Sequence, residues 1–154
     1  MQSPRPGFTL EASPDHPGWQ RWRLNDPTTF NETVLAPVLV RRESESTARV
    51  RIHPRQGHHN NGGHVHGGVT LALIDVALFA AARVLRDIDA AGSVTIGLES
   101  QFIGAGDMAR PLDAVVEVLR ETGRMVFLRG LVMQDEDIVA SFSGTTRKPS
   151  RPRT

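Results

Sequence analysis

The feature that most constrains the fold is the stretch from residue 58 to residue 86, where a glycine- and histidine-rich turn runs directly into a long apolar segment. Between Val69 and Ala82 every residue is apolar except Thr70 and Asp75, and no glycine or proline interrupts the run. Apolar residues recur at the three- and four-residue spacing of a helix and occupy most of its sides. The segment therefore predicts a long helix enclosed in the core. Its uninterrupted apolar length is too short for a membrane span, and an acid lies in its middle.

Composition narrows the class of protein. A chain of 154 residues has the size of one domain with a sizeable core. The absence of cysteine excludes a disulfide scaffold and a thiol nucleophile. The N-terminal stretch lacks the apolar core of a signal peptide, so we expect a cytoplasmic protein. A net charge of +1 gives no general attraction to nucleic acid or to membranes.

The two ends of the chain differ from its middle. Residues 1–24 are rich in proline, glycine and charge and are predicted to be a flexible leader, although Trp19 and Trp22 could anchor it to the domain. Residues 25–147 are predicted to form the domain, and residues 148–154 a basic, disordered tail.

Within the domain, one short helix and six strands accompany the long helix. Asp26-Pro27 has the pattern of a helix start and predicts a short helix to about residue 34. Apolar runs and alternation predict strands at 35–42, 47–53, 94–103, 112–120, 125–134 and 138–145. Pro37 limits the first of them to a sheet edge or a kink. In the strand at 94–103, Val94, Ile96 and Leu98 are predicted to share one face. Strands that follow one buried helix favour an α+β fold, with an antiparallel sheet wrapped around that helix.

Asp75 is the main candidate for chemistry, because a carboxylate in a buried helix is costly unless a partner or a reaction uses it. The N–H groups of Gly67 and Gly68 lie at the start of this helix, where its dipole favours a polarised carbonyl or an oxyanion. Asn60, in the preceding loop, could orient a water or a carbonyl. The set is compatible with acyl transfer in which Asp75 acts as general base or nucleophile.

The same residues could instead have purely structural roles. Asp75 could be a satisfied buried polar group or could face a subunit interface, and two glycines before a helix are common in turns. The histidines between residues 53 and 66 include a His64-x-His66 pair that resembles two metal ligands. A zinc site needs three or four fixed ligands, so exposed or backbone-bonded loop histidines are the better interpretation.

The string NNGGHVHGGVTLALID, from Asn60 to Asp75, resembles the signature of hotdog-fold acyl-CoA thioesterases of the phenylacetate-pathway type, relatives of 4-hydroxybenzoyl-CoA thioesterase. In that family, Asn-x-x-Gly-x-x-His-Gly-Gly leads into the central helix and an acid follows the histidine by nine positions. The resemblance extends from about Phe30 to Arg147. It implies a hotdog fold, hydrolysis of an acyl-CoA to free acid and CoA, and no metal or other cofactor.

The resemblance also assigns roles to individual residues. Asp75 would be the base or nucleophile, the N–H of Gly68 (with Gly67) would hold the thioester carbonyl, and Asn60 would orient water or the carbonyl. His66 would support the loop or assist the oxyanion site. Further candidates are Thr95 beside the water and, for substrate binding, Gly63, Gly67, Gly123 and Arg124.

The family implies a homodimer whose two sheets join into one, with active sites between protomers, so that Asp75 faces the partner's Asn60; a homotetramer is a further possibility. Three other functions remain open at this point: a hotdog enoyl-CoA hydratase or dehydratase, a non-catalytic acyl-CoA-binding domain, and a structural assembly protein. The acyl group is not specified by the sequence.

Overall fold

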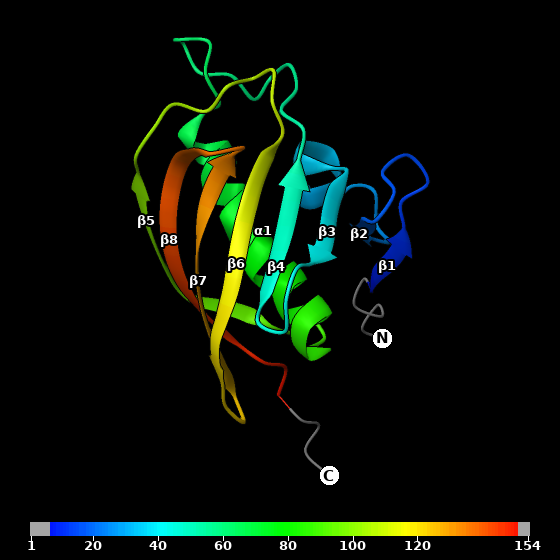
Figure 1. The fold of residues 1–154 in the computed structure, drawn as a ribbon. Helices are drawn as coiled ribbons and strands as arrows, with labels where there is room; N and C mark the ends of the chain where they lie inside the picture. The colour runs from blue at the N-terminus through cyan, green and yellow to red at the C-terminus, as the bar shows by residue number, and fades with distance from the viewer. Residues whose placement is uncertain (1–6, 151–154) are drawn as a thin grey trace.

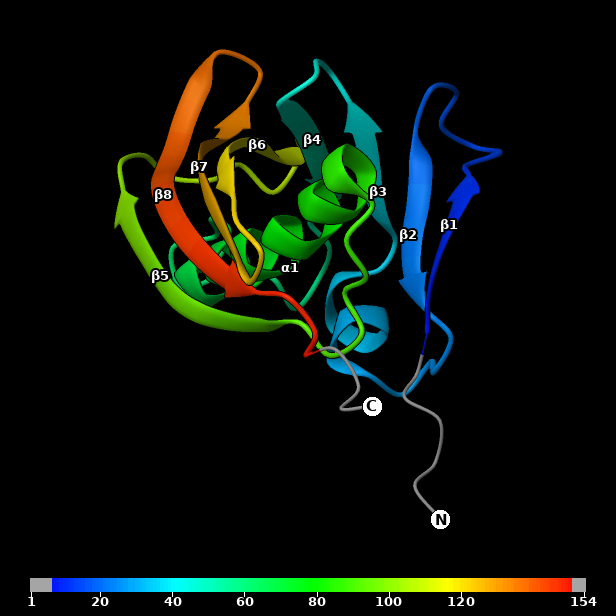
Figure 2. The ribbon, with the colours of Figure 1, turned by 90° about the horizontal axis from the view of Figure 1, so that it is seen from below.

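The computed structural model describes residues 7–150 and shows one antiparallel sheet wrapped around one long helix (Figure 1, Figure 2). The elements are β1 Phe8–Ala12, β2 Gln20–Leu24, η1 Asn31–Leu35, β3 Val38–Arg42, β4 Thr47–Ile52, α1 Gly67–Arg86, β5 Val94–Phe102, β6 Leu112–Glu121, β7 Met125–Gln134 and β8 Asp137–Arg147. The sheet order is β1-β2-β3-β4-β6-β7-β8-β5, so β1 and β5 form its two edges. The predicted α+β architecture, an antiparallel sheet around a central helix, is confirmed.

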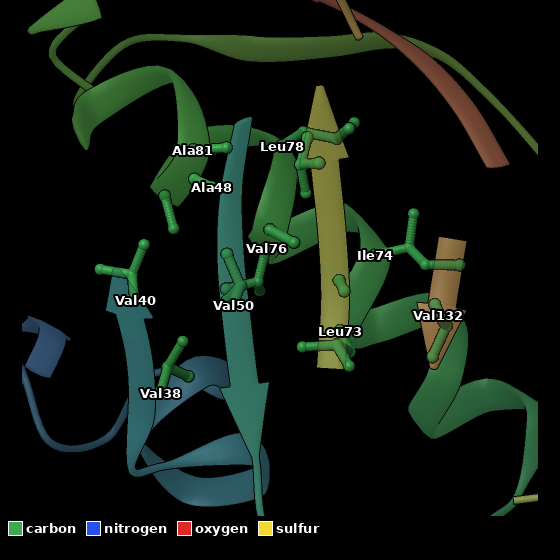
Figure 3. Packing of buried hydrophobic residues seen from close by; sticks show 14 of the residues in the cluster. Val38, Val40, Ala48, Val50, Leu73, Ile74, Val76, Leu78, Ala81 and Val132 are labelled. Carbon is green, nitrogen blue, oxygen red and sulfur yellow. The ribbon is translucent and has the colours of Figure 1, made fainter. Parts of the chain in front are cut away.

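The core lies between α1 and the inner face of the sheet. Side chains of the helix, among them Leu73, Ile74 and Leu78, pack against valines of the strands such as Val50 and Val132 (Figure 3). Full burial of each such side chain stabilises the fold by roughly 1.5–3 kcal/mol. By length and composition α1 could cross a membrane, but more than half of its apolar stretch is buried inside the protein, as expected of a core helix.

One stripe of α1 remains open in the single chain. Gly68 and Leu71 are exposed, and Asp75 and Phe79 are half-buried, at the spacing of successive helix turns. The prediction that the helix is enclosed on most sides therefore holds for the faces that pack on the sheet, and Asp75 lies on the open stripe, beside Thr95 of β5.

The leader is more ordered than predicted. Residues 8–24 form the hairpin of β1 and β2, which extends the sheet beyond β3 (Figure 2). Trp22 is buried and stacks on Phe8, and Trp19 lies under the guanidinium groups of Arg41 and Arg51, 4.5 and 4.6 Å from its ring centre. The expectation of a flexible leader is therefore wrong for these residues, although the two tryptophans do anchor them. Residues 1–6 and 151–154, the rest of the predicted leader and tail, lie outside the described residues.

Two other sequence predictions need correction. The predicted short helix is a turn followed by one π-helical turn, η1, and β3 begins only after Pro37, in the interior of the sheet between β2 and β4. In β5 a bulge between Thr95 and Gly97 interrupts the alternation, so that Ile96 is 53% exposed while Leu98 packs against the core.

The hairpin is expected to weaken in acid because of a histidine pair. The rings of His16 and His53 lie 5.3 Å apart, and burial, with the charges of His16 and Arg51, lowers the pKa of His53 below its usual 6.5 despite the opposing effect of Asp113. Since the folded state disfavours protonated His53, its contribution to stability is present above pH 6.5 and is lost as the pH falls below that value.

We expect the free energy of unfolding to fall between pH 7.5 and pH 5.5, and to fall less steeply in His53→Gln. Tryptophan fluorescence during urea unfolding measures this directly, because the chain's two tryptophans both lie at the hairpin. His64→Gln, in an exposed loop, is the control and should keep the wild-type slope. Equal slopes for His53→Gln and wild type would contradict the prediction.

Candidate active site

The first turn of α1 leaves one backbone donor free. His66 is the N-cap, and its Nδ1 accepts the N–H of Gly68 at 2.8 Å. The N–H groups of Val69 and Thr70 donate to the His66 carbonyl at 2.9 and 3.3 Å. Within residues 7–150, the N–H of Gly67 has no hydrogen-bond acceptor. The free donor at the positive end of the helix dipole is therefore Gly67, whereas the Gly68 donor is engaged by His66.

The loop before α1 is held by its own hydrogen bonds. The Asn60 Oδ1 accepts the N–H groups of Gly62 and His64 at 2.9 and 3.1 Å, and Gly63 supplies a left-handed backbone with φ of +79°. The Asn60 amide nitrogen makes no hydrogen bond within the described part of the chain. Its side-chain oxygen is thus fixed, and the –NH₂ group is the part that can meet a ligand.

The loop that contains Gly106 packs against the turn before α1. The Val65 N–H donates to the Gly106 carbonyl at 2.9 Å, and a Cβ at Gly106 would lie only 2.9 Å from the Val65 Cβ. The His66 N–H donates to the His58 carbonyl, and the buried His58 ring has its Nε2 2.7 Å from the Val34 carbonyl oxygen. These contacts fix the position of the backbone that carries the free donor.

Asp75 lies in the middle of α1, beside the start of β5. The Thr95 hydroxyl donates to the Asp75 Oδ1 at 2.6 Å, a length typical of a charge-assisted hydrogen bond. Because of the β5 bulge, Thr95 turns toward the helix. Among the described residues Thr95 is the only hydrogen-bond partner of this side chain, so the Oδ2 is available to a water or a substrate.

The predicted residues thus form two groups within one chain. Asp75 and Thr95 form the carboxylate group, and Asn60, Gly63, His66, Gly67 and Gly68 form the donor group. Gly67 and Asp75 are eight residues apart on one helix, about 12 Å along its axis. The predicted substrate residues Gly123 and Arg124 lie in the β6–β7 turn, at the end of the sheet far from the start of α1 (Figure 1). Their role stays a prediction.

The remaining histidines offer no alternative centre. In the described part of the chain no group of three or more His, Cys, Asp or Glu side chains is placed to hold a metal ion. His58 is buried as a structural residue, and His53 contacts His16 away from the helix start.

Sequence reasoning did not assign Phe102 to the site. A Cβ on Gly67 would lie 3.3 Å from the Phe102 ring, so this ring at the end of β5 lies against the start of α1. Phe102 is nevertheless 53% exposed. In the sequence Phe102 is only a large apolar residue at the end of a predicted strand. That pattern does not predict a contact with the start of the helix.

Known proteins match both the chain and its fold. A family model described as Thioesterase superfamily matches residues 62–141. The Pseudomonas aeruginosa protein named "Putative esterase PA0474" is 30% identical over 116 residues, which are 75% of this chain and 86% of that protein. The chain belongs to the thioesterase superfamily. Its relatives support hydrolysis of thioester or ester bonds as the class of activity.

Solved structures agree on the architecture of this thioesterase. Zebrafish thioesterase superfamily member 2 has a TM-score of 0.67 and 19% identity, over 80% of this chain and 88% of that one. A variant of the phenylacetic acid degradation protein PaaI from Thermus thermophilus has a TM-score of 0.64 and 23% identity, over 80% and 99% of the two chains. The predicted hotdog fold and the resemblance to hotdog-fold thioesterases are confirmed.

Proposed function

We propose that this thioesterase hydrolyses an acyl-CoA to the free acid and CoA, at a site that two copies of the chain form together. Membership of the superfamily supports the reaction class. The observation that supports a site shared by two copies is the separation of the two residue groups. The free donor at Gly67 and the carboxylate at Asp75 lie about 12 Å apart along α1.

The chemistry needs both groups at one carbonyl. Asp75 removes a proton from a water that attacks the thioester carbon, or attacks that carbon itself before water hydrolyses the resulting anhydride. The carbonyl oxygen gains negative charge, which the Gly67 N–H stabilises. When the C–S bond breaks, CoA leaves as the thiolate and takes up a proton. The Thr95 hydroxyl holds one carboxylate oxygen, so that Oδ2 faces the reaction.

One chain cannot present both groups to the same thioester. An oxyanion donor must lie about 2.7–3.1 Å from the carbonyl oxygen, and the base must lie within hydrogen-bond reach of the attacking water. A gap of about 12 Å along the axis is too long for that geometry. A second copy resolves the mismatch, with Asp75 and Thr95 of one protomer facing Gly67 and Asn60 of the partner subunit. This is the homodimer that the sequence resemblance implies.

Two variants that are inactive alone should restore activity together. Asp75→Asn removes the carboxylate, and Gly67→Pro removes the free N–H. In a heterodimer of the two, one site has both defects and the other combines an intact Asp75 with an intact Gly67. We expect the isolated heterodimer to have about half the wild-type activity per dimer.

The experiment co-expresses the variants with two different affinity tags, isolates the heterodimer through both tags, and measures thiol release from a panel of acyl-CoAs. Homodimers of each variant, prepared with the same tags, are the controls. If wild type cleaves acyl-CoA but the heterodimer is as inactive as its parents, each site lies within one chain. Absence of thiol release by wild type on every acyl-CoA would refute the proposed reaction.

A further inference from the structure

Gln134, the last residue of β7, has a buried polar side chain that the proposed reaction does not use. It is 1% exposed. Its Oε1 accepts the N–H of Asp107 at 2.7 Å, and its Nε2 donates to the carbonyls of Asp107 and Arg110 at 2.8 and 3.1 Å. Buried amides need such partners, and here all three belong to the main chain of one loop. Gln134 therefore fixes the loop between β5 and β6.

This loop, residues 103–111, lies beside the turn that leads into α1 (Figure 1). It contains no helix or strand, so its position depends on contacts with other elements. Near its start, the N–H groups of Ile103 and Gly104 donate to the Val139 carbonyl at 2.9 and 3.1 Å. Further along, Gln134 holds Asp107. Gly106 lies between these two attachments and is held from both sides.

Arg110 attaches the same loop on its solvent side. Its guanidinium lies 3.2 Å from the Asp107 carboxylate and 2.9 Å from that of Asp137. These carboxylates are 47% and 70% exposed, and exposed ion pairs contribute little to the stability of a structure. The hydrogen bonds of Gln134 are buried, and breaking them leaves main-chain groups of the loop without partners. Gln134 is therefore the stronger attachment of the two.

Gly106 connects the loop to the oxyanion donor. Its carbonyl accepts the Val65 N–H at 2.9 Å, and a Cβ at Gly106 would lie 2.9 Å from the Val65 Cβ. Val65 is followed by His66, the N-cap of α1, and then by the free N–H of Gly67. A shift of the loop at Asp107 therefore displaces main chain that lies two residues before the donor.

We propose that Gln134 is a positioning residue for the oxyanion donor. It acts through Asp107 and Gly106, which keep the main chain from Val65 to Gly67 in place. The inference rests on the proposed function, because that function assigns the donor to Gly67. An oxyanion donor must lie about 2.7–3.1 Å from the oxygen that it stabilises. A displacement of about 1 Å can lower a rate about 10²-fold, so a residue that never touches the substrate can still control kcat.

Gln134→Met tests the role of the amide, because methionine has a similar length but makes none of the three hydrogen bonds. We expect kcat for acyl-CoA hydrolysis to fall about 10- to 100-fold. KM should stay near the wild-type value, since the donor acts on charge that develops only in the transition state. Gln134→Glu is a second variant of nearly the same shape that retains the acceptor for the Asp107 N–H. It should also lower kcat, because a carboxylate cannot donate to the two carbonyls.

Leu85→Ala is the control for stability. Leu85 is buried in the last turn of α1, at the opposite end of the helix from Gly67, and its truncation destabilises the fold by leaving a cavity. It should keep the wild-type kcat at a temperature at which circular dichroism shows all variants to be folded. A wild-type kcat in folded Gln134→Met would overturn the proposal, as would an equal loss of kcat in Leu85→Ala.

A double-mutant cycle tests whether Gln134 acts through the Gly67 donor. If it does, adding Gln134→Met to Gly67→Pro lowers kcat no further, because the donor that Gln134 positions is already absent. A purely structural effect of Gln134 would lower kcat by the same factor in both backgrounds. Losses that multiply would therefore contradict a positioning role.

Hydrogen exchange tests the same connection without any enzymatic activity, because it reports local opening of the main chain. In Gln134→Met we expect several-fold faster exchange in the peptide that covers residues 62–68, which contains the Val65 N–H. Leu85→Ala should keep the wild-type rate in that peptide. Wild-type exchange there in Gln134→Met would show that Gln134 does not hold this turn.

The two readouts distinguish failure of this inference from failure of the proposed function. If wild type cleaves no acyl-CoA, the proposed reaction is wrong, whereas faster exchange in Gln134→Met still shows that Gln134 holds the turn before α1. If wild type cleaves acyl-CoA but the losses in the double-mutant cycle multiply, the reaction stands and the positioning role of Gln134 is wrong.

Discussion

Asp75→Asn is expected to lower kcat for acyl-CoA hydrolysis by about 10²–10⁴-fold, the contribution typical of a positioned general base. The amide has nearly the same shape as the carboxylate, and its oxygen can still accept the hydrogen bond that the Thr95 hydroxyl now donates at 2.6 Å. The new side chain cannot take a proton from water or attack a carbonyl. Since the position lies on the open stripe of α1, the exchange leaves the packed faces of the helix unchanged.

Thiol release measured over a range of substrate concentrations separates kcat from KM for this variant. Glu136→Gln, in the exposed β7–β8 turn, removes a carboxylate that belongs to neither residue group of the site and serves as the matched control, with activity equal to wild type. Circular dichroism and thermal unfolding show whether Asp75→Asn retains its fold. A folded variant with wild-type kcat would mean that Asp75 has only a structural role, and the proposed mechanism would then be wrong.

The sequence predicts the parts of this fold that depend on local pattern. The run from Val69 to Ala82 has the period and composition of a helix whatever its surroundings, and the later strands alternate or stay apolar between clear turns. The hairpin of β1 and β2 has no such pattern. Its two strands are only five residues each. They are held in place by the pairing of β2 with β3 and by the contacts of Trp19 and Trp22. These interactions join residues that are distant in sequence, so local pattern does not predict them.

The candidate site also has one part that the sequence predicts and one part that it does not. The spacing from Asn60 to Asp75 predicts that the glycine-rich loop leads directly into the helix that carries the acid, because motif and helix are contiguous, and the structure shows this. Which glycine N–H is left free could not be predicted, since it depends on the His66 ring turning back to accept the Gly68 N–H. The place of Thr95 on the inner face also depends on a bulge, which strict alternation does not anticipate.

The second large expected effect on kcat concerns Gly67, whose N–H is free, and not Gly68, whose N–H is bound by His66. Gly67→Pro is expected to lower kcat by about 10²–10³-fold, the usual cost of losing one oxyanion donor. Proline deletes the N–H at the first residue of α1, the position where proline is best tolerated in a helix, and it also adds ring carbons against Phe102. The preceding residue, His66, already has the extended backbone that proline requires before it, with φ of −62° and ψ of 137°.

Gly67→Ala separates the donor from the side chain. It adds a Cβ at the same 3.3 Å from the Phe102 ring but keeps the N–H, so it should retain most of the wild-type kcat. If the two variants have similar thermal stability, the difference in their rates of thiol release gives the contribution of the Gly67 N–H to kcat. Equal losses in both would indicate that crowding against Phe102, and not the missing donor, impairs the enzyme. Full activity in Gly67→Pro would instead mean that the oxyanion is held elsewhere. The Asn60 amide would then be one candidate, because its –NH₂ group also makes no hydrogen bond within the described part of the chain.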